Sequence, residues 1–230
     1  MHISYRREID GLRAIAVIPV MIFHAGFNFF EGGFLGVDVF FVISGYLITS
    51  MILVQQSNDQ FSYSLFYERR IRRIIPALLI VMIACIPFAY FMMQPDDLEN
   101  FGQSLISTTL MSNNILLYIT SGYWDLTSAF KPLLHTWSLG IEEQYYLIFP
   151  ILISGLLCIK RINLFFALCF ITFLSFIFFL KINLNNPDAA FYLLPSRFWE
   201  IGLGSCSAIY LLHHAPKKPL NFKKNFLLYL

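Results

Sequence analysis

Long apolar runs separated by short polar stretches are the dominant pattern of this chain. About 20 apolar residues are needed for a helix to cross the roughly 30 Å hydrocarbon core of a bilayer. Six runs approach that length, and they cover residues 14–30, 33–54, 74–93, 141–157, 164–180 and 198–212. The pattern predicts an all-α integral membrane protein, a polytopic bundle of about six to eight membrane helices.

A further apolar stretch, residues 98–119, is interrupted by polar side chains and does not fit a simple crossing. Basic residues favour the cytoplasmic side of a membrane, which places the N-terminus and the arginines of 69–73 there. If the stretch crossed once, the basic groups at 160–161 and 217–218 would lie outside. We therefore expect residues 98–136 to begin and end outside, as a re-entrant hairpin beside a cavity, because irregular backbone at membrane depth needs protein or water around it.

The composition supports a membrane protein and excludes other classes. Hydrophobic residues make up 57% of the chain and charged residues 13%, whereas a soluble domain has roughly 25% charged residues. The net charge of +2, with basic residues grouped near helix ends, argues against a nucleic-acid partner. The four cysteines show no metal-ligand spacing, so no metal site is expected. No small-residue cleavage site follows the first apolar run, which predicts a retained helix and not a signal peptide.

Ionisable residues in the first two expected membrane helices are candidate functional residues, because each costs at least about 2.5–3.5 kcal/mol there. Arg13 and His24 are eleven residues apart, so they differ by about 20° in direction and about 16 Å in height on one helix. Arg13 alone could instead snorkel to the interface, and His24 alone could be a satisfied core histidine. Asp38 and Ser44 lie in the second run. Asp38 could cap a helix at the interface, or pair with Arg13 or His24 to offset its burial.

The segment "HTWSLGIEEQYYLIFP", residues 135–150, begins another apolar run with one histidine and two glutamates. Glu142 lies seven residues after His135 and four after Ser138, so a helix that reaches back to His135 places all three on one face. Glu143 points about 100° away, toward a headgroup or another helix. A histidine beside a carboxylate can act as a general base, because the carboxylate fixes the tautomer and stabilises the imidazolium.

Four arginines precede the third run in "ERRIRRIIP", residues 68–76. Anchoring on the cytoplasmic side accounts for one or two of them. Guanidinium groups also bind phosphates through two parallel hydrogen bonds, and helix N-termini favour anions, so the cluster is a candidate phosphate clamp. Anionic lipid headgroups are the rival ligand, and the sequence leaves the two open.

Four stretches together resemble the membrane acyltransferase-3 family. They are "REIDGLRAIAVIPVMIFHAG", "GGFLGVDVFFVISGYLIT", "FYERRIRRIIPAL" and "PLLHTWSLGIEEQYYLIFP". A fifth stretch, "RFWEIGLGS" at residues 197–205, fits more weakly. The matches occur in the expected order from residue 5 to about residue 205, and the first two are most similar to O-antigen and peptidoglycan O-acetylases.

The resemblance implies transfer of an acyl group, usually acetyl, from cytoplasmic acetyl-CoA to a hydroxyl of a surface polysaccharide or lipid-linked sugar, such as lipopolysaccharide O-antigen. It implies a multi-pass protein of the bacterial inner membrane with a cytoplasmic N-terminus and no permanently bound cofactor. Carried onto this chain, the family pattern marks Arg69, Arg70, Arg72 and Arg73 as contacts of the CoA phosphates. It marks Arg13 and His24 as the functional pair of the first helix and Glu142 as the glutamate of the fourth motif. Further motif positions are Trp137, Ser138 and Arg197.

Our mechanistic hypothesis is that His24, oriented by Glu142 or Asp38, takes the proton of an acceptor hydroxyl as it attacks the thioester. Arg13 would stabilise developing negative charge or guide the donor. A covalent acyl-enzyme on His24, Ser44 or Ser138 is equally compatible with the sequence. The competing classes are a transporter or proton relay that uses the same buried charges, and a non-catalytic scaffold that binds anionic lipid.

Related proteins have about ten membrane helices, often followed by a soluble SGNH-type domain. Residues 1–230 are therefore expected to form the N-terminal part of an acyltransferase-3 membrane domain, which by itself need not be catalytically complete.

Overall fold

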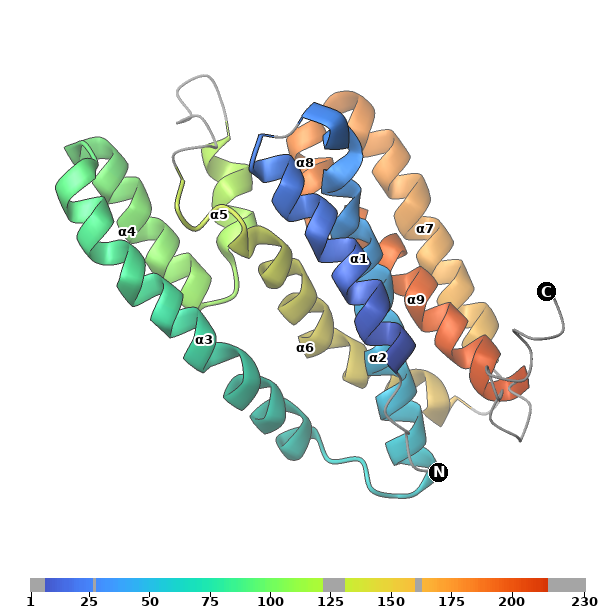
Figure 1. Cartoon of the computed structure of the whole chain (residues 1–230). Helices are drawn as coiled ribbons and strands as arrows, with labels where there is room; N and C mark the ends of the chain where they lie inside the picture. The colour runs from blue at the N-terminus through green and yellow to red at the C-terminus, as the bar shows by residue number, and fades with distance from the viewer. Residues whose placement is uncertain (1–6, 27, 122–130, 160–162, 215–230) are drawn as a thin grey trace, which may run out of the picture.

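A computed structural model of the chain describes residues 7–26, 28–121, 131–159 and 163–214, and in these ranges every regular element is a helix (Figure 1). In chain order the elements are α1 (Arg7–His24), the 3₁₀ helix η1 (Asn28–Leu35), α2 (Gly36–Ser57), α3 (Tyr63–Met92), α4 (Pro95–Thr109), α5 (Asn113–Thr120), α6 (Thr136–Cys158), α7 (Leu164–Asn185), α8 (Pro187–Tyr192) and α9 (Leu194–His214).

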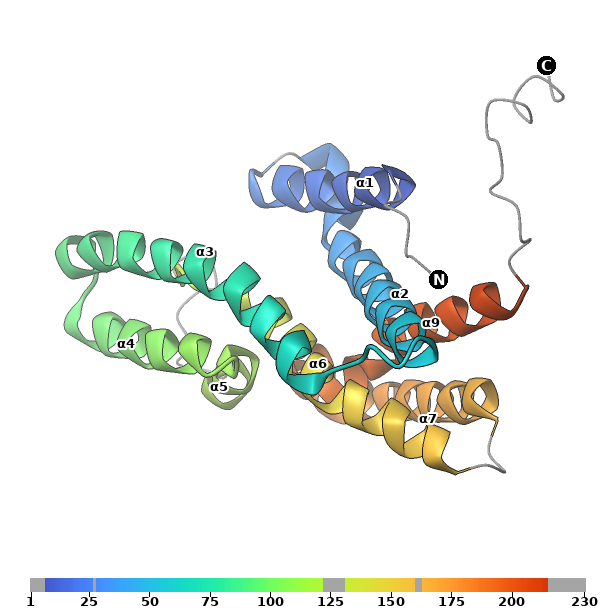
Figure 2. The same ribbon diagram turned by 90° about the horizontal axis from the view of Figure 1, so that it is seen from below.

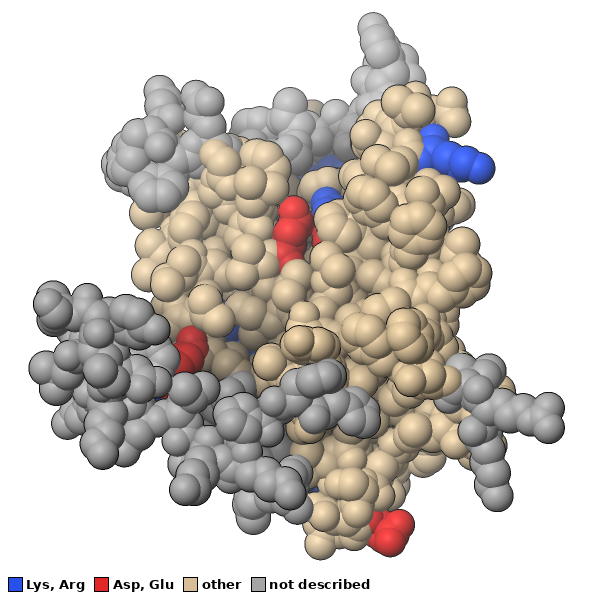
Figure 3. Space-filling view, turned by 90° about the vertical axis from the view of Figure 1, so that its right-hand side faces the viewer, with Lys and Arg blue, Asp and Glu red and all other residues tan. Residues whose placement is uncertain are grey.

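The helices fit a membrane. Four stretches are long and apolar enough to cross one, and they are Gly32–Ser57, Tyr63–Met92, Thr136–Cys158 and Leu164–Asn185. Two further long helices, α1 and α9, match the other apolar runs but carry more charged or polar residues. The described part of the face seen in Figure 3 is mainly uncharged and carries a few scattered acidic and basic side chains, and a mainly apolar surface fits contact with lipid. The prediction of an all-α polytopic membrane protein is confirmed.

The central bundle is built from α1, α2, α6, α7 and α9, and α3 and α4 extend from it as an arm (Figure 2). The closest contact in the bundle joins α2 to α9. A Cβ atom at Gly45 would overlap the carbonyl of Ile201, and one at Gly204 would overlap the carbonyl of Val42. Small residues that allow backbones to approach this closely are the usual means of joining membrane helices.

The stretch expected to re-enter the membrane forms two short helices. The 15-residue α4 and the 8-residue α5 are each too short to cross about 30 Å of hydrocarbon. A turn at residues 110–112, in which Met111 has φ +53°, separates them. Figure 1 shows that α4 begins, and α5 ends, toward the same end of the molecule, as the hairpin prediction requires. The basic groups at 160–161 and 217–218, used in the orientation argument, lie outside the described residues.

Two buried asparagines explain why this stretch is polar. Asn113 donates to the carbonyl of Leu133 at 3.0 Å and to Thr136 Oγ1 at 2.7 Å. Asn114 donates to the carbonyl of Tyr192 at 2.9 Å and accepts from Gln144 Nε2 at 2.8 Å. These bonds fix α5 against the segment before α6 and against α8, and so position one wall of the cavity described next.

Candidate active site

A cavity of about 450 Å³ lies among α1, α2, α6, α8 and α9, at the end of the bundle where α1 ends and α6 begins. It borders on the end of the predicted hairpin segment through Leu134 and His135. Six of its lining residues are sites predicted from the sequence, and they are His24, Asp38, His135, Trp137, Ser138 and the weaker candidate Arg197. The rest of the lining is mainly apolar and aromatic. Concave, mostly apolar sites with a few convergent polar groups are typical of ligand pockets.

His24 and His135 meet in this cavity. Their ring centroids are 4.5 Å apart and the rings are nearly perpendicular, at 72°. His24 is the last residue of α1, and His135 directly precedes the first residue of α6. Burial, and then the neighbouring His24, lower the pKa of His135 below its ordinary value of 6.5. His135 is therefore held as a neutral imidazole beside His24 at neutral pH.

Neither carboxylate that the sequence hypothesis assigned to His24 orients it in this structure. Asp38 pairs with Arg197, not with Arg13 or His24, at a distance of 3.1 Å between Oδ1 and Nη1. Glu142 accepts hydrogen bonds from other residues. The reason is depth: Glu142 lies seven residues beyond His135, about 10 Å further along α6. The residue that contacts His24 is instead His135, which the sequence analysis placed on the same helix face as Glu142.

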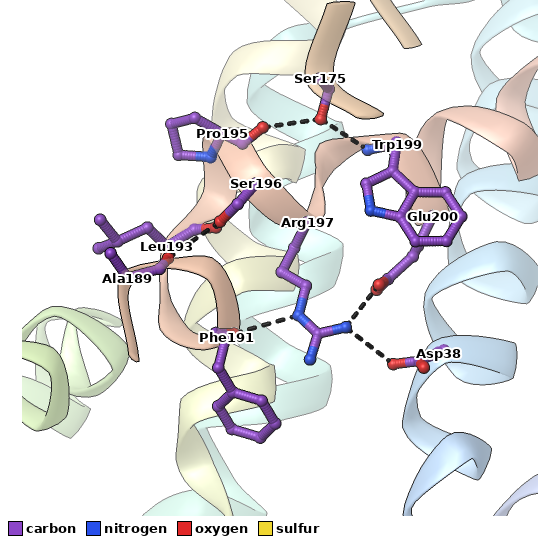
Figure 4. A network of polar contacts seen from close by, with 10 residues as sticks. All are labelled: Asp38, Ser175, Ala189, Phe191, Leu193, Pro195, Ser196, Arg197, Trp199 and Glu200. Carbon is purple, nitrogen blue, oxygen red and sulfur yellow. Dashed lines mark hydrogen bonds and ion pairs between the residues drawn. The ribbon is translucent and has the colours of Figure 1, made fainter. Parts of the chain in front are cut away.

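Arg197 is the centre of a polar network that joins α2, α8 and α9 (Figure 4). Its Nε donates to the carbonyl of Phe191 at 3.1 Å, and its Nη1 donates to Asp38 and to Glu200. The Arg197 side chain is 10% exposed and that of Glu200 only 2%. Such buried pairs are strongly destabilising to break, because the remaining charge is left uncompensated.

Glu142 borders a second cavity of about 290 Å³ between α1, α2 and α6. This cavity adjoins the first, because both are lined by Val20, Met21, Val37 and Ser138. Glu142 accepts a hydrogen bond from Ser44 Oγ at 2.9 Å and one from the hydroxyl of Tyr146 at 3.3 Å. The two predicted residues Ser44 and Glu142 are thus brought together, on the side of the main cavity that leads toward the other end of the bundle.

The four arginines lie in the first turns of α3, and they are not equivalent. Arg70 pairs with Glu143 at 3.1 Å and covers the ring of Tyr146 at 3.6 Å, which confirms that Glu143 faces another helix. Arg72 pairs with Glu68 on its own helix and is largely exposed. Arg69 and Arg73 are exposed, and no ion pair is seen for either within the described ranges. The guanidinium groups of the cluster that remain accessible are therefore those of Arg69, Arg72 and Arg73.

Arg13, unlike His24 with which the sequence paired it, lines neither cavity. It faces the bundle about three turns below His24, and its Nε is buried with no hydrogen-bond partner within the described residues. Sequence reasoning also missed Glu200, which binds Arg197 from one turn away. A signal for it existed: Glu200 is a charged residue three positions after Arg197 in an otherwise apolar run.

Comparison with known proteins decides the family. The sequence matches the acyltransferase-3 profile, described as "Acyltransferase domain", over residues 6–228. The chain belongs to the acyltransferase-3 family. No solved structure matches it.

Curated relatives of this acyltransferase-3 chain are named as O-acetyltransferases. The peptidoglycan O-acetyltransferase OatA of Listeria monocytogenes is 42% identical over 149 residues, which are 64% of this chain and 24% of that protein. The putative peptidoglycan O-acetyltransferase YrhL of Bacillus subtilis is 34% identical over 217 residues, or 90% of this chain and 34% of the relative. The O-acetyltransferase OatA of Staphylococcus aureus is 38% identical over 162 residues, or 66% and 25%. The chain thus spans about a quarter to a third of the length of these relatives.

Membership of the acyltransferase-3 family confirms the resemblance drawn from the motifs. The main cavity collects side chains from four of the five motif stretches: His24 from the first, Asp38 from the second, His135 from the fourth and Arg197 from the weakest. The third stretch, with the arginines, lies in the first turns of α3, toward the opposite end of the bundle. The roles of the individual residues remain predictions.

Proposed function

We propose that this protein transfers an acetyl group from acetyl-CoA to a hydroxyl of a cell-wall polysaccharide, and that the transfer takes place in the cavity that holds His24 and His135. The observation that carries the proposal is the edge-to-face contact of these two imidazoles at 4.5 Å in a cavity lined by the family's motif residues. Histidine is the side chain most often used to move a proton near neutral pH.

In the proposed reaction, His24 accepts the proton of the acceptor hydroxyl while its oxygen attacks the thioester carbonyl. His135 stays neutral because of its lowered pKa, so the imidazolium that forms on His24 does not face a second cation. Two positive rings at this separation would repel each other, and the pair therefore favours a single proton. The proton then leaves with the thiolate as CoA–SH, which returns His24 to its neutral form.

For the donor, we propose that the phosphates of acetyl-CoA bind the accessible arginines of α3, Arg69, Arg72 and Arg73. These lie toward the end of the bundle opposite the cavity, and the second cavity with Glu142 lies between the two regions. This arrangement supports an inner-membrane protein with a cytoplasmic N-terminus, in which the donor binds inside and the hydroxyl is acylated outside. The apolar lining of the second cavity suits an acetyl group and excludes charged phosphates.

For the acceptor, the names of the relatives favour peptidoglycan over the lipopolysaccharide O-antigen suggested by the motifs. The aromatic side chains of Trp137 and Phe191, whose ring centroids are 4.4 Å apart, form an apolar wall beside the Asp38 carboxylate. A surface of this kind can contact the apolar face of a sugar ring while a carboxylate accepts from its hydroxyls.

The test is transfer of labelled acetyl from acetyl-CoA to peptidoglycan fragments, with O-antigen as the rival acceptor, by membranes that contain the chain. We expect label in peptidoglycan, and loss of at least 100-fold of the rate in His24→Ala. Ser207→Ala, an exposed position on α9, is the matched control and should keep the wild-type rate. Full activity in His24→Ala would contradict the proposal, and ion flux without acetyl transfer would favour a transporter.

A further inference from the structure

The guanidinium of Arg197 is held on two of its three nitrogens, and the third is left open. Nε is bound to the carbonyl of Phe191, and Nη1 to Asp38 and Glu200. Nη2 has no acceptor among the described residues, and Figure 4 shows it pointing away from all three partners. Nη2 is also not one of the fully buried polar atoms without a hydrogen-bond partner, so it is at least partly accessible. Because Arg197 lines the main cavity, the free donors of Nη2 are available to a ligand there.

Arg197 shares this cavity with the imidazole pair, whereas Arg13 does not. The two residues are alternatives for one task, the stabilisation of negative charge during acyl transfer. Arg13 lies about 16 Å below His24 along α1. Arg197 therefore replaces Arg13 as the guanidinium that faces the proposed reaction.

The charges around Arg197 indicate what kind of oxygen it would bind. Asp38 and Glu200 both contact Nη1, so they offset the positive charge while they fix the plane of the guanidinium. A site of this kind offers oriented N–H donors without a large net positive charge. It suits a neutral carbonyl oxygen that becomes negative in the transition state better than an oxygen that is already anionic. The mainly apolar lining strengthens such a hydrogen bond, because the local dielectric constant is low.

We infer that Nη2 of Arg197 is the oxyanion donor for acyl transfer in this cavity, and that Asp38, Glu200 and the Phe191 carbonyl position it. The inference rests on the proposed function. As a C–O bond forms between the attacking hydroxyl and the acyl carbonyl, the hydroxyl proton passes to His24 and the carbonyl electron pair moves onto oxygen, where Nη2–H donates to it. The carbonyl then re-forms, the bond to the leaving group breaks, and the leaving group departs with the proton from His24.

The test uses 4-nitrophenyl acetate, a small neutral ester, with the 230-residue chain in lipid nanodiscs. Hydrolysis of this ester needs the imidazole pair and the oxyanion donor but neither CoA binding nor a sugar. We expect Arg197→Gln to lower kcat about 100- to 1000-fold, as loss of one oxyanion donor does in other enzymes, while KM changes less than about 3-fold. Lys181→Gln removes an exposed charge at the end of α7 and is the control for charge loss alone.

Arg197→Lys guards against a variant that simply fails to fold, because it keeps a cation beside Asp38 and Glu200 but loses the planar fork. Its kcat should fall at least about 10-fold at an unchanged melting temperature. Wild-type kcat in a folded Arg197→Lys or Arg197→Gln variant, a change confined to KM, or no hydrolysis by the unmodified chain would each overturn the inference. Arg197-dependent hydrolysis without transfer from acetyl-CoA would leave the inference standing and count against the proposed function.

Discussion

The imidazoles of His24 and His135 lie edge to face at 4.5 Å, although one ends the first helix and the other precedes the sixth. The contact exists because α1 and α6 both reach the same end of the bundle, and because the short α5 holds the segment before α6 in place through Asn113. It brings the two imidazole rings that line the main cavity into direct contact.

The contact predicts that the two histidines act as one unit. His24→Gln and His135→Gln should each lower the rate of acetyl transfer, by roughly 10²- to 10⁴-fold for His24 and less for His135. The double variant should be little slower than His24→Gln, because residues that act together are not additive. A double-mutant cycle on the transfer rate measures this coupling. Multiplication of the two separate effects would show that the rings work independently.

The pH dependence follows from the lowered pKa of His135, whose causes are burial and then the neighbouring His24. A lowered pKa keeps the His135 ring neutral as the pH falls to the ordinary value of 6.5, so the transfer rate should hold from pH 8 to about 6.5 and drop below it.

The same lowered pKa affects stability. The folded state binds fewer protons at His135 than the unfolded state, so the contribution of His135 to stability is present above pH 6.5 and is lost as the pH falls through the lowered pKa. Among the described residues that line the cavity, the charged groups besides the two histidines are Asp38 and Arg197.

The pH profile of kcat/KM checks this expectation, with His135→Gln as the comparison. In that variant the decrease at low pH should move, because the His135 imidazole with its lowered pKa is gone. An acid limb that is identical in the two proteins would assign the titration to another group.

The contact between α2 and α9 predicts a steric effect on stability. Gly45→Ala places a methyl group against the carbonyl of Ile201, and Gly204→Ala places one against the carbonyl of Val42. Backbone atoms cannot yield as a flexible side chain would, so each change should cost about 1–3 kcal/mol or more. Thermal unfolding in detergent measures the loss. Gly102→Ala and Gly155→Ala are matched controls in helices with open space at the Cβ position, and a similar loss in these controls would contradict the packing argument.

The arginines of α3 should separate into a structural and a binding class. Arg70→Gln breaks the half-buried pair with Glu143 and the contact with Tyr146, so it should cost about 1.5–3 kcal/mol of stability. Arg69→Gln and Arg73→Gln remove exposed charges and should raise KM for acetyl-CoA with little effect on stability. Melting temperatures and KM values of the three variants provide the comparison. An equal loss of stability in all three would remove the distinction.

The sequence predicted the helices well, because apolar length is a strong signal and each of the six runs overlaps one long helix. It also identified most of the polar residues that line the main cavity, since charge in an apolar run is costly and therefore informative. The polar stretch with Asn113 was correctly separated from the simple crossings for the same reason.

Pairing between helices was harder to predict, because the period of a helix gives the direction of a side chain but not its neighbour. Asp38 was expected beside Arg13 or His24 and lies against Arg197, which is distant in sequence. His24 was expected beside the carboxylate of Glu142 or Asp38 and lies against His135. Both differences depend on how deep each helix sits relative to the others, a quantity set by packing contacts such as that between Gly45 and Ile201.

The most direct test of the central claim is transfer across the membrane. Sealed vesicles would hold the chain with the α3 arginines facing inward, labelled acetyl-CoA only inside and peptidoglycan fragments only outside. We predict that label appears on the external fragments with the intact chain and is lost with His24→Ala. Label that stays inside, or that reaches the outside equally well without His24, would contradict the account.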